Sequence, residues 1–104
     1  MKIAVFGGAG FLGSHVADAL SNAGHEVIIY DLKPSPCLSR SQKMITGDIM
    51  DVRAVEKVVA GCEVVYNFAG IADLDEAILQ PLECIKTNIL GNGILLEAAR
   101  KAKI

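Results

Sequence analysis

Four glycines lie within seven residues near the start of the chain, and their spacing is suited to holding a phosphate group. They stand in Gly7-Gly8-Ala9-Gly10-Phe11-Leu12-Gly13, directly after an apolar run at 2–6. Gly7 or Gly8 permits a sharp turn off a strand. Gly10 lets backbone N–H groups approach an anion with no Cβ in the way, and Gly13 lets the following helix pack closely on a sheet.

A strand, a glycine turn and a helix in this order can cradle the pyrophosphate of a dinucleotide. The free N–H groups and the positive end of the helix dipole then face the anion. The residues predicted to form this part of the site are Gly7, Gly10, Phe11, Leu12 and Gly13. A glycine-rich turn without a ligand is the alternative for these residues taken alone.

An acidic residue stands where a dinucleotide site needs one. The second apolar run, 26–30, is followed by Asp31, 18 positions after Gly13. A carboxylate there accepts hydrogen bonds from both hydroxyls of the adenine ribose and repels a 2′-phosphate, which favours NAD over NADP. Leu32 and Lys33 extend the predicted contact, and Lys33 and Arg40 are the cations that would weaken the preference. The alternative for Asp31 is a turn residue, because prolines follow at 34 and 36.

Length and composition are those of one globular domain, residues 1–104. A hydrophobic content of 52% is enough for a core. The net charge of −2 indicates neither a nucleic acid nor an anionic membrane as a partner. The N-terminal apolar run is too short for a signal peptide or a membrane span, so we expect a cytoplasmic location.

The cysteines and histidines predict no metal site. Cys37, Cys62 and Cys84 show neither C-x-x-C nor zinc spacing and are expected to be reduced thiols. Cys62 and Cys84 are expected in the core. His15 is expected on a helix face and His25 in a turn, without a catalytic role.

Strands and helices alternate along the chain. The patterns predict strands at 2–6, 26–30, 43–46 and 63–68, and helices at 11–23, 51–60 and 81–102, with a short turn of helix at 74–79. Asp51 is the expected N-cap of its helix. The loop 32–42 is expected to be flexible and to lie beside the adenosine. We therefore predict an α/β fold of Rossmann type, with a doubly wound parallel sheet of about four strands in the order 3-2-1-4.

Three further stretches complete a pattern: Gly47-Asp48-Ile49-Met50-Asp51, Asn67-Phe68-Ala69-Gly70 and Thr87-Asn88-Ile89-Leu90-Gly91. With the glycine segment and Asp31, they resemble the extended short-chain dehydrogenase/reductase family, the NAD-dependent nucleotide-sugar epimerases and dehydratases. The resemblance extends over essentially all 104 positions. It implies NAD as the cofactor.

The resemblance also implies roles for single residues. Asp48 and the backbone N–H of Ile49 would contact the adenine edge, although the residues alone allow Asp48 to be a turn or cap residue. Phe68, Ala69 and Gly70 would lie along the cofactor, and the small size of Ala69 and Gly70 would let a flat cofactor pass over them. Asn88 is expected to be buried in its helix, in a structural role, with its amide bonded to backbone near the fourth strand.

The family's catalytic residues have no counterpart in these positions. Members use a Tyr-x-x-x-Lys pair with a Ser or Thr, whereas Pro34 and Gly70 stand four residues after Tyr30 and Tyr66, the two tyrosines. We expect an NAD-binding N-terminal half, ending before the fifth strand and inactive alone. The full-length protein would act on a nucleotide sugar and form a homo-oligomer, with helix contacts through 81–102.

Two functions of other classes remain open. One is a non-catalytic regulatory or sensor domain that binds NAD or NADP. The other is a small domain that acts through protein contacts. A Tyr-x-x-x-Lys in downstream sequence would decide for the enzyme. Asp73 is a candidate substrate contact, with a solvated loop charge as the alternative.

Overall fold

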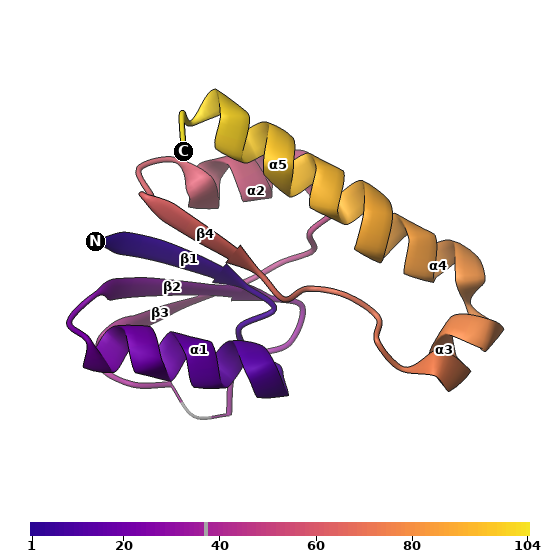
Figure 1. Ribbon diagram of the computed structural model, residues 1–104, viewed down its shortest axis with the longest axis horizontal. Helices are drawn as coiled ribbons and strands as arrows, with labels where there is room; N and C mark the ends of the chain where they lie inside the picture. The colour runs from indigo at the N-terminus through magenta and orange to yellow at the C-terminus, as the bar shows by residue number, and fades with distance from the viewer. Residues whose placement is uncertain (37) are drawn as a thin grey trace.

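The computed structural model describes residues 1–36 and 38–104, so the prediction for Cys37 lies outside the described residues. One sheet of four parallel strands forms the centre of the molecule (Figure 1). The strands are β1 (Lys2–Phe6), β2 (Glu26–Asp31), β3 (Gln42–Thr46) and β4 (Val64–Asn67), in the spatial order β3-β2-β1-β4. This confirms the predicted class and strand order. The last strand is shorter than predicted, and Gln42 belongs to β3 rather than to the preceding loop.

Helices cover both faces of the sheet. Figure 1 shows α1 (Phe11–Asn22) on one face and α2 (Val52–Val59) with α5 (Gly91–Lys101) on the other. Alternate residues of β1 face the two layers: Ile3 and Val5 pack in the cluster that contains Ala17 of α1, and Ala4 and Phe6 pack with residues of α2 and α5. Burial on both faces explains why the central strands are continuous apolar runs.

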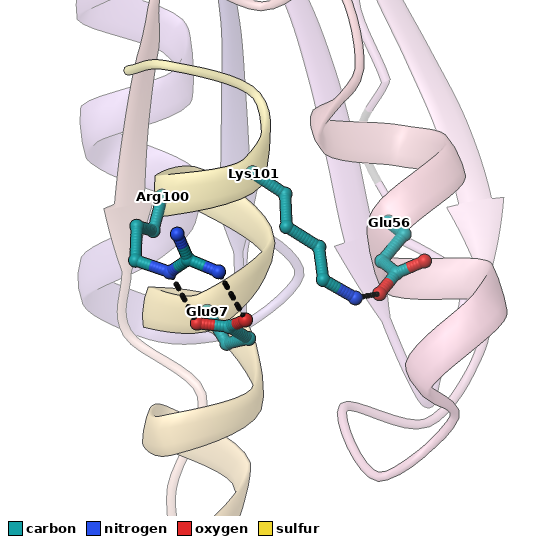
Figure 2. A network of polar contacts seen from close by, with 4 residues as sticks. All are labelled: Glu56, Glu97, Arg100 and Lys101. Carbon is teal, nitrogen blue, oxygen red and sulfur yellow. Dashed lines mark hydrogen bonds and ion pairs between the residues drawn. The ribbon is translucent and has the colours of Figure 1, made fainter.

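The N-cap of α2 is the one predicted. The Asp51 side chain accepts a hydrogen bond from the Ala54 N–H at 3.1 Å, and Val55, Val58 and Val59 are buried. Lys101 of α5 also contacts α2, with its Nζ 2.8 Å from Glu56 Oε1, while Arg100 pairs with Glu97 within α5 (Figure 2). The side chains in these ion pairs are solvent-exposed, so the pairs contribute little to stability. Apolar contact in the core holds α2 and α5 together.

The predicted helix at 81–102 is not one regular α-helix. It consists of α4 (Pro81–Ile85), the π-helical segment η1 (Lys86–Leu90) and α5, and the short α3 (Leu74–Leu79) precedes it. The periodicity of apolar residues does not reveal a π turn, which adds one residue within a continuous helix. Two contacts hold this segment in place: Asn88, in the middle of η1, bonds to the loop after β4, and Gly91, directly after η1, packs against Ile49.

β4 lies at one edge of the sheet and, among the described residues, pairs with β1 alone. Figure 1 shows α3 and α4 extending past the carboxyl ends of the strands, away from the rest of the sheet. Across 1–36 and 38–104, no helix has both the length and the apolar content needed to cross a membrane.

Candidate functional site

A cleft of about 480 Å³ opens at the carboxyl ends of the strands, the position at which open parallel sheets bind their ligands. Most residues predicted for the site line it: Gly7, Gly10, Asp31, Leu32, Lys33, Asp48, Ile49, Phe68, Ala69 and Gly70. They come from the last residue of β2 and from the loops after all four strands. The fold therefore gathers segments that are up to about 60 residues apart in the chain.

The glycine turn is built by close backbone contacts. Gly7 has φ +75°, and a Cβ there would lie 2.5 Å from the Phe68 carbonyl carbon. Its N–H donates to the Tyr30 carbonyl at 2.8 Å. A Cβ at Gly10 would make only an ordinary contact, 3.4 Å from the Gly7 carbonyl oxygen, so there is room beside this cleft-lining position. Only glycine therefore fits position 7, whereas a larger residue at position 10 would fill the cleft.

Gly13 packs against a different partner from the one predicted. A Cβ at this position would lie 2.2 Å from the Gly7 carbonyl oxygen and 3.0 Å from the Gly8 Cα. The first turn of α1 thus rests on the glycine turn itself rather than on the sheet. The reason is geometric, because the chain passes from the turn directly into α1, and the first residues of the helix lie against the turn.

The N-terminus of α1 has no side-chain cap. Gly10 is its N-cap, and no acidic residue stands in the first turn, whereas Asp51 and Asp73 cap α2 and α3. The side chains of Phe11 and Leu12 are 85% and 59% exposed and do not line the cleft. What this helix start offers to a ligand is its backbone N–H groups, which have no intrahelical acceptor.

The Asp31 carboxylate bonds to two backbone groups. Oδ2 accepts from the Ala9 N–H at 3.0 Å, and Oδ1 accepts from the Lys33 N–H at 3.2 Å. An ionised carboxylate has about four acceptor positions. Asp31 therefore holds the glycine turn and still has capacity for two ligand hydroxyls. Arg40 does not line the cleft.

The turn after β3 is held by Asp48. Its Oδ1 accepts from the Met50 N–H at 2.9 Å, and its backbone carbonyl accepts from the Asp51 N–H at 3.0 Å and from the Tyr30 hydroxyl at 2.8 Å. Ile49 points its side chain into the core, with 5% exposed. Only its backbone is therefore available for the predicted ligand contact.

Asn88 is exposed, which corrects the prediction that it is buried. Its Oδ1 accepts from the Ile71 N–H at 2.7 Å, and its Nδ2 donates to the Ile71 carbonyl at 2.9 Å. The predicted partner, backbone beyond the fourth strand, is correct. The burial is wrong because η1 lies beyond the end of the sheet, where little covers it. Asn88 does not line the cleft but supports the loop that does.

The two described cysteines differ. Cys62 is buried, as predicted, and burial raises the pKa of its thiol. Cys84 is only partly buried, because it lies on α4 beside the loop at Ile71 rather than under the sheet. Within the described residues, no group of three or more His, Cys, Asp or Glu side chains could hold a metal ion.

Comparison with known proteins agrees with this geometry. The family model described as "NAD dependent epimerase/dehydratase family" matches residues 3–104. The chain belongs to this family. A UDP-glucose 4-epimerase of Haemophilus influenzae is 34% identical over 116 residues, which cover all of this chain and 34% of that protein. The chain thus spans about a third of the length of such relatives.

Solved structures of family members have the same fold. The UDP-glucose 4-epimerase of Thermotoga maritima, solved with UDP-glucose, superposes with a TM-score of 0.91 at 34% identity, over 100% of this chain and 35% of that one. The enzyme of Bifidobacterium longum, solved with NAD+ and UDP, gives 0.88 at 30% identity, over 100% and 35%.

The cleft of this epimerase/dehydratase family member also contains residues that were not predicted as cofactor contacts. They are Tyr30, Gly47, Met50, Ile71, Ala72, Glu76, Gln80, Glu83 and Thr87. Several are direct neighbours of predicted residues, and adjacency in sequence would have found them. Those of α3, α4 and η1 reach the cleft only because these helices extend past the strand ends.

Asp73 has a local role in the structure. Its side chain accepts from the Asp75 N–H at 2.9 Å and caps α3. It is exposed, and it does not line the cleft. This geometry favours Asp73 as a solvated charge of the loop and not as a substrate contact.

Proposed function

We propose that residues 1–104 bind the adenosine and pyrophosphate of NAD. The observation that carries this proposal is the uncapped N-terminus of α1, which starts at the Gly7 turn and shares that turn with the Asp31 carboxylate. Anion-binding N–H groups and a ribose acceptor thus stand side by side. The NAD+ in the Bifidobacterium longum relative supports the same choice of ligand.

The residues present fit this ligand. The N–H groups of Phe11, Leu12 and Gly13 would hold the pyrophosphate, whereas the Gly10 N–H already donates to the Gly7 carbonyl at 3.2 Å. The room beside Gly10, where a Cβ would come no nearer than 3.4 Å to another atom, admits the ligand. Asp31 would hold the adenine ribose, with Leu32 and Lys33 beside it. Of these positions, Gly10, Asp31, Leu32 and Lys33 line the cleft.

The rest of the cleft would hold the ends of the cofactor. Asp48 and the Ile49 N–H would bind the adenine edge. Phe68, Ala69 and Gly70 would lie along the cofactor toward its nicotinamide, with Asn88 holding the loop in place. NAD supplies the capacity to accept a hydride and return it.

We further propose that the whole protein is an NAD-dependent epimerase or dehydratase acting on a nucleotide sugar. The family and the epimerases among the relatives support this reaction class over a non-catalytic sensor. The 104 residues contain no Tyr-x-x-x-Lys, so the acid/base group would lie outside them.

Calorimetric titration of the folded chain with NAD tests the binding proposal. We expect saturable binding that Gly10→Val abolishes, because the valine side chain would occupy the room beside this position. Gly93→Ala is the matched control, since a Cβ there meets nothing within 4 Å and Gly93 does not line the cleft. A folded chain that binds no NAD, or a Gly10→Val variant that binds it normally, would contradict the proposal.

A further inference from the structure

We propose that Tyr30 is a positioning residue for the adenine side of the cleft. Its hydroxyl holds the turn at 47–50 where Asp48 and Ile49 can meet the base. The inference rests on the proposed binding of NAD and adds a residue that the glycine motif and the acid at position 31 do not include.

The ring of Tyr30 is held rigidly. It is 2% exposed and lies next to Phe6, with ring centroids 4.9 Å apart and an interplanar angle of 43°. In the sheet, Tyr30 pairs with Phe6 on one side and Ile45 on the other. A ring packed in the middle of a sheet has one position, so its hydroxyl is a fixed point.

The hydroxyl ends at the turn. Tyr30 Oη donates to the Asp48 carbonyl at 2.8 Å, the same oxygen that accepts the Asp51 N–H at 3.0 Å. Gly47 passes so close that a Cβ there would lie 2.3 Å from Oη. The phenol therefore determines both the path and the orientation of the backbone that enters the turn.

The hydroxyl remains a donor at neutral pH. Burial raises the pKa of Tyr30, and the carboxylates of Asp51 and Asp48 raise it further, because each disfavours a phenolate. The hydrogen bond from Tyr30 to the Asp48 carbonyl therefore persists over the physiological pH range.

The turn presents one free acceptor of its own. Asp48 Oδ1 is bonded to the Met50 N–H, whereas Oδ2 has no hydrogen-bond partner among residues 1–36 and 38–104. A carboxylate oxygen of this kind matches the exocyclic amino group of adenine. The contribution of Asp48 Oδ2 to binding depends on where the turn places it, because a hydrogen bond weakens steeply when its distance grows or its angle closes. Loss of the anchor would therefore reduce recognition of the base itself.

The test compares Tyr30→Phe with Tyr66→Phe, which removes the hydroxyl of the other tyrosine. Tyr66 lies on β4, does not line the cleft, and its hydroxyl has no bonded partner in the described part of the chain. Each protein is titrated with NAD and with deamino-NAD, in which a carbonyl oxygen replaces the adenine amino group.

We expect the unchanged chain to bind NAD more tightly than deamino-NAD. Tyr30→Phe should weaken NAD binding about fivefold, the usual effect of one hydrogen bond, with little change for deamino-NAD. The ratio of the two affinities should therefore fall in Tyr30→Phe and stay unchanged in Tyr66→Phe. If Tyr30 had only a general structural role, Tyr30→Phe would weaken the binding of NAD and of deamino-NAD equally. That result would overturn the inference.

Amide exchange without ligand separates this inference from the proposed function. Tyr30→Phe should speed exchange at Met50 and Asp51, whose N–H groups bond to Asp48. Tyr66→Phe should not. If the unchanged chain binds neither dinucleotide, the proposed function fails and the adenine role fails with it. If NAD binds but the affinity ratio or the exchange is the same in Tyr30→Phe, only the role of Tyr30 is wrong.

Discussion

The Asp31 carboxylate accepts a hydrogen bond from the Ala9 N–H at 3.0 Å, which ties the end of β2 to the glycine turn after β1. The same side chain accepts from the Lys33 N–H. Asp31 thus holds the backbone on both sides of the proposed ribose site. A substitution there changes the shape of the loop as well as its charge.

Replacement of Asp31 by asparagine and by alanine should separate these two effects. The unchanged chain should prefer NAD to NADP, because a carboxylate repels a 2′-phosphate. Both variants should narrow the preference. Asp31→Asn keeps an oxygen that can accept from Ala9, whereas Asp31→Ala should weaken NAD binding by roughly a further tenfold. Titration with both cofactors measures this, and tighter NADP binding by the unchanged chain would contradict it and direct attention to Lys33 and Arg40.

Two glycine-to-alanine changes should have opposite effects on stability. A Cβ at Gly13 would collide with the Gly7 carbonyl oxygen, so Gly13→Ala should lower the free energy of unfolding by about 1–3 kcal/mol. Gly93→Ala adds a better helix former at an exposed position of α5 and should raise it by about 0.5–1 kcal/mol. Urea denaturation of both variants gives these values. Equal stability of the two variants would show that the turn at Gly7 can shift to accommodate the Cβ of Gly13→Ala.

Stability should depend on pH in alkaline solution through Tyr30. Because the folded chain raises the pKa of this phenol, the folded state disfavours ionisation. The contribution is complete below the ordinary pKa of about 10 and is lost as the pH rises through the higher folded value. Tyr30→Phe should be about 1 kcal/mol less stable than the unchanged chain at pH 8, and the difference should shrink above about pH 10. Urea midpoints from pH 8 to 11 measure it; a constant difference would be inconsistent with a buried, protonated phenol.

The edge of the sheet at β4 should make the 104-residue chain self-associate. Val64–Asn67 pair with β1 alone among the described residues, and an apolar edge strand offers its free backbone groups to another strand. Sedimentation over a concentration series should show association, and Tyr66→Lys should reduce it by placing a charge on the edge. A strictly monomeric chain with protected amides at 64–68 would be evidence against this expectation.

The 104-residue chain should catalyse neither epimerisation nor dehydration. It contains no Tyr-x-x-x-Lys that could take the proton from a sugar hydroxyl while the carbon gives up a hydride. Assays with NAD and UDP-glucose should therefore give the same background rate for this chain and for Gly10→Val, which controls for contaminating host enzyme. Turnover by the unchanged chain, together with no turnover by Gly10→Val, would contradict the prediction.

The sequence by itself determined the parallel α/β fold, its strand order, the family, and most of the cleft-lining segments. The fold class and the site segments depend on short-range pattern: apolar runs, the glycine spacing from Gly7 to Gly13, and an acid directly after the second apolar run. Such patterns are local because a turn or a strand end must be made by neighbouring residues. The strand order is the usual one for the fold that these motifs indicate.

Only the tertiary structure decided which distant residues support that site. The anchor of Asp48 by Tyr30 joins residues 18 positions apart. The collision partner of Gly13, the π segment at 86–90 and the exposure of Asn88 likewise depend on how the elements pack. Periodicity reports which face of an element is apolar, but not which atom of another element that face meets.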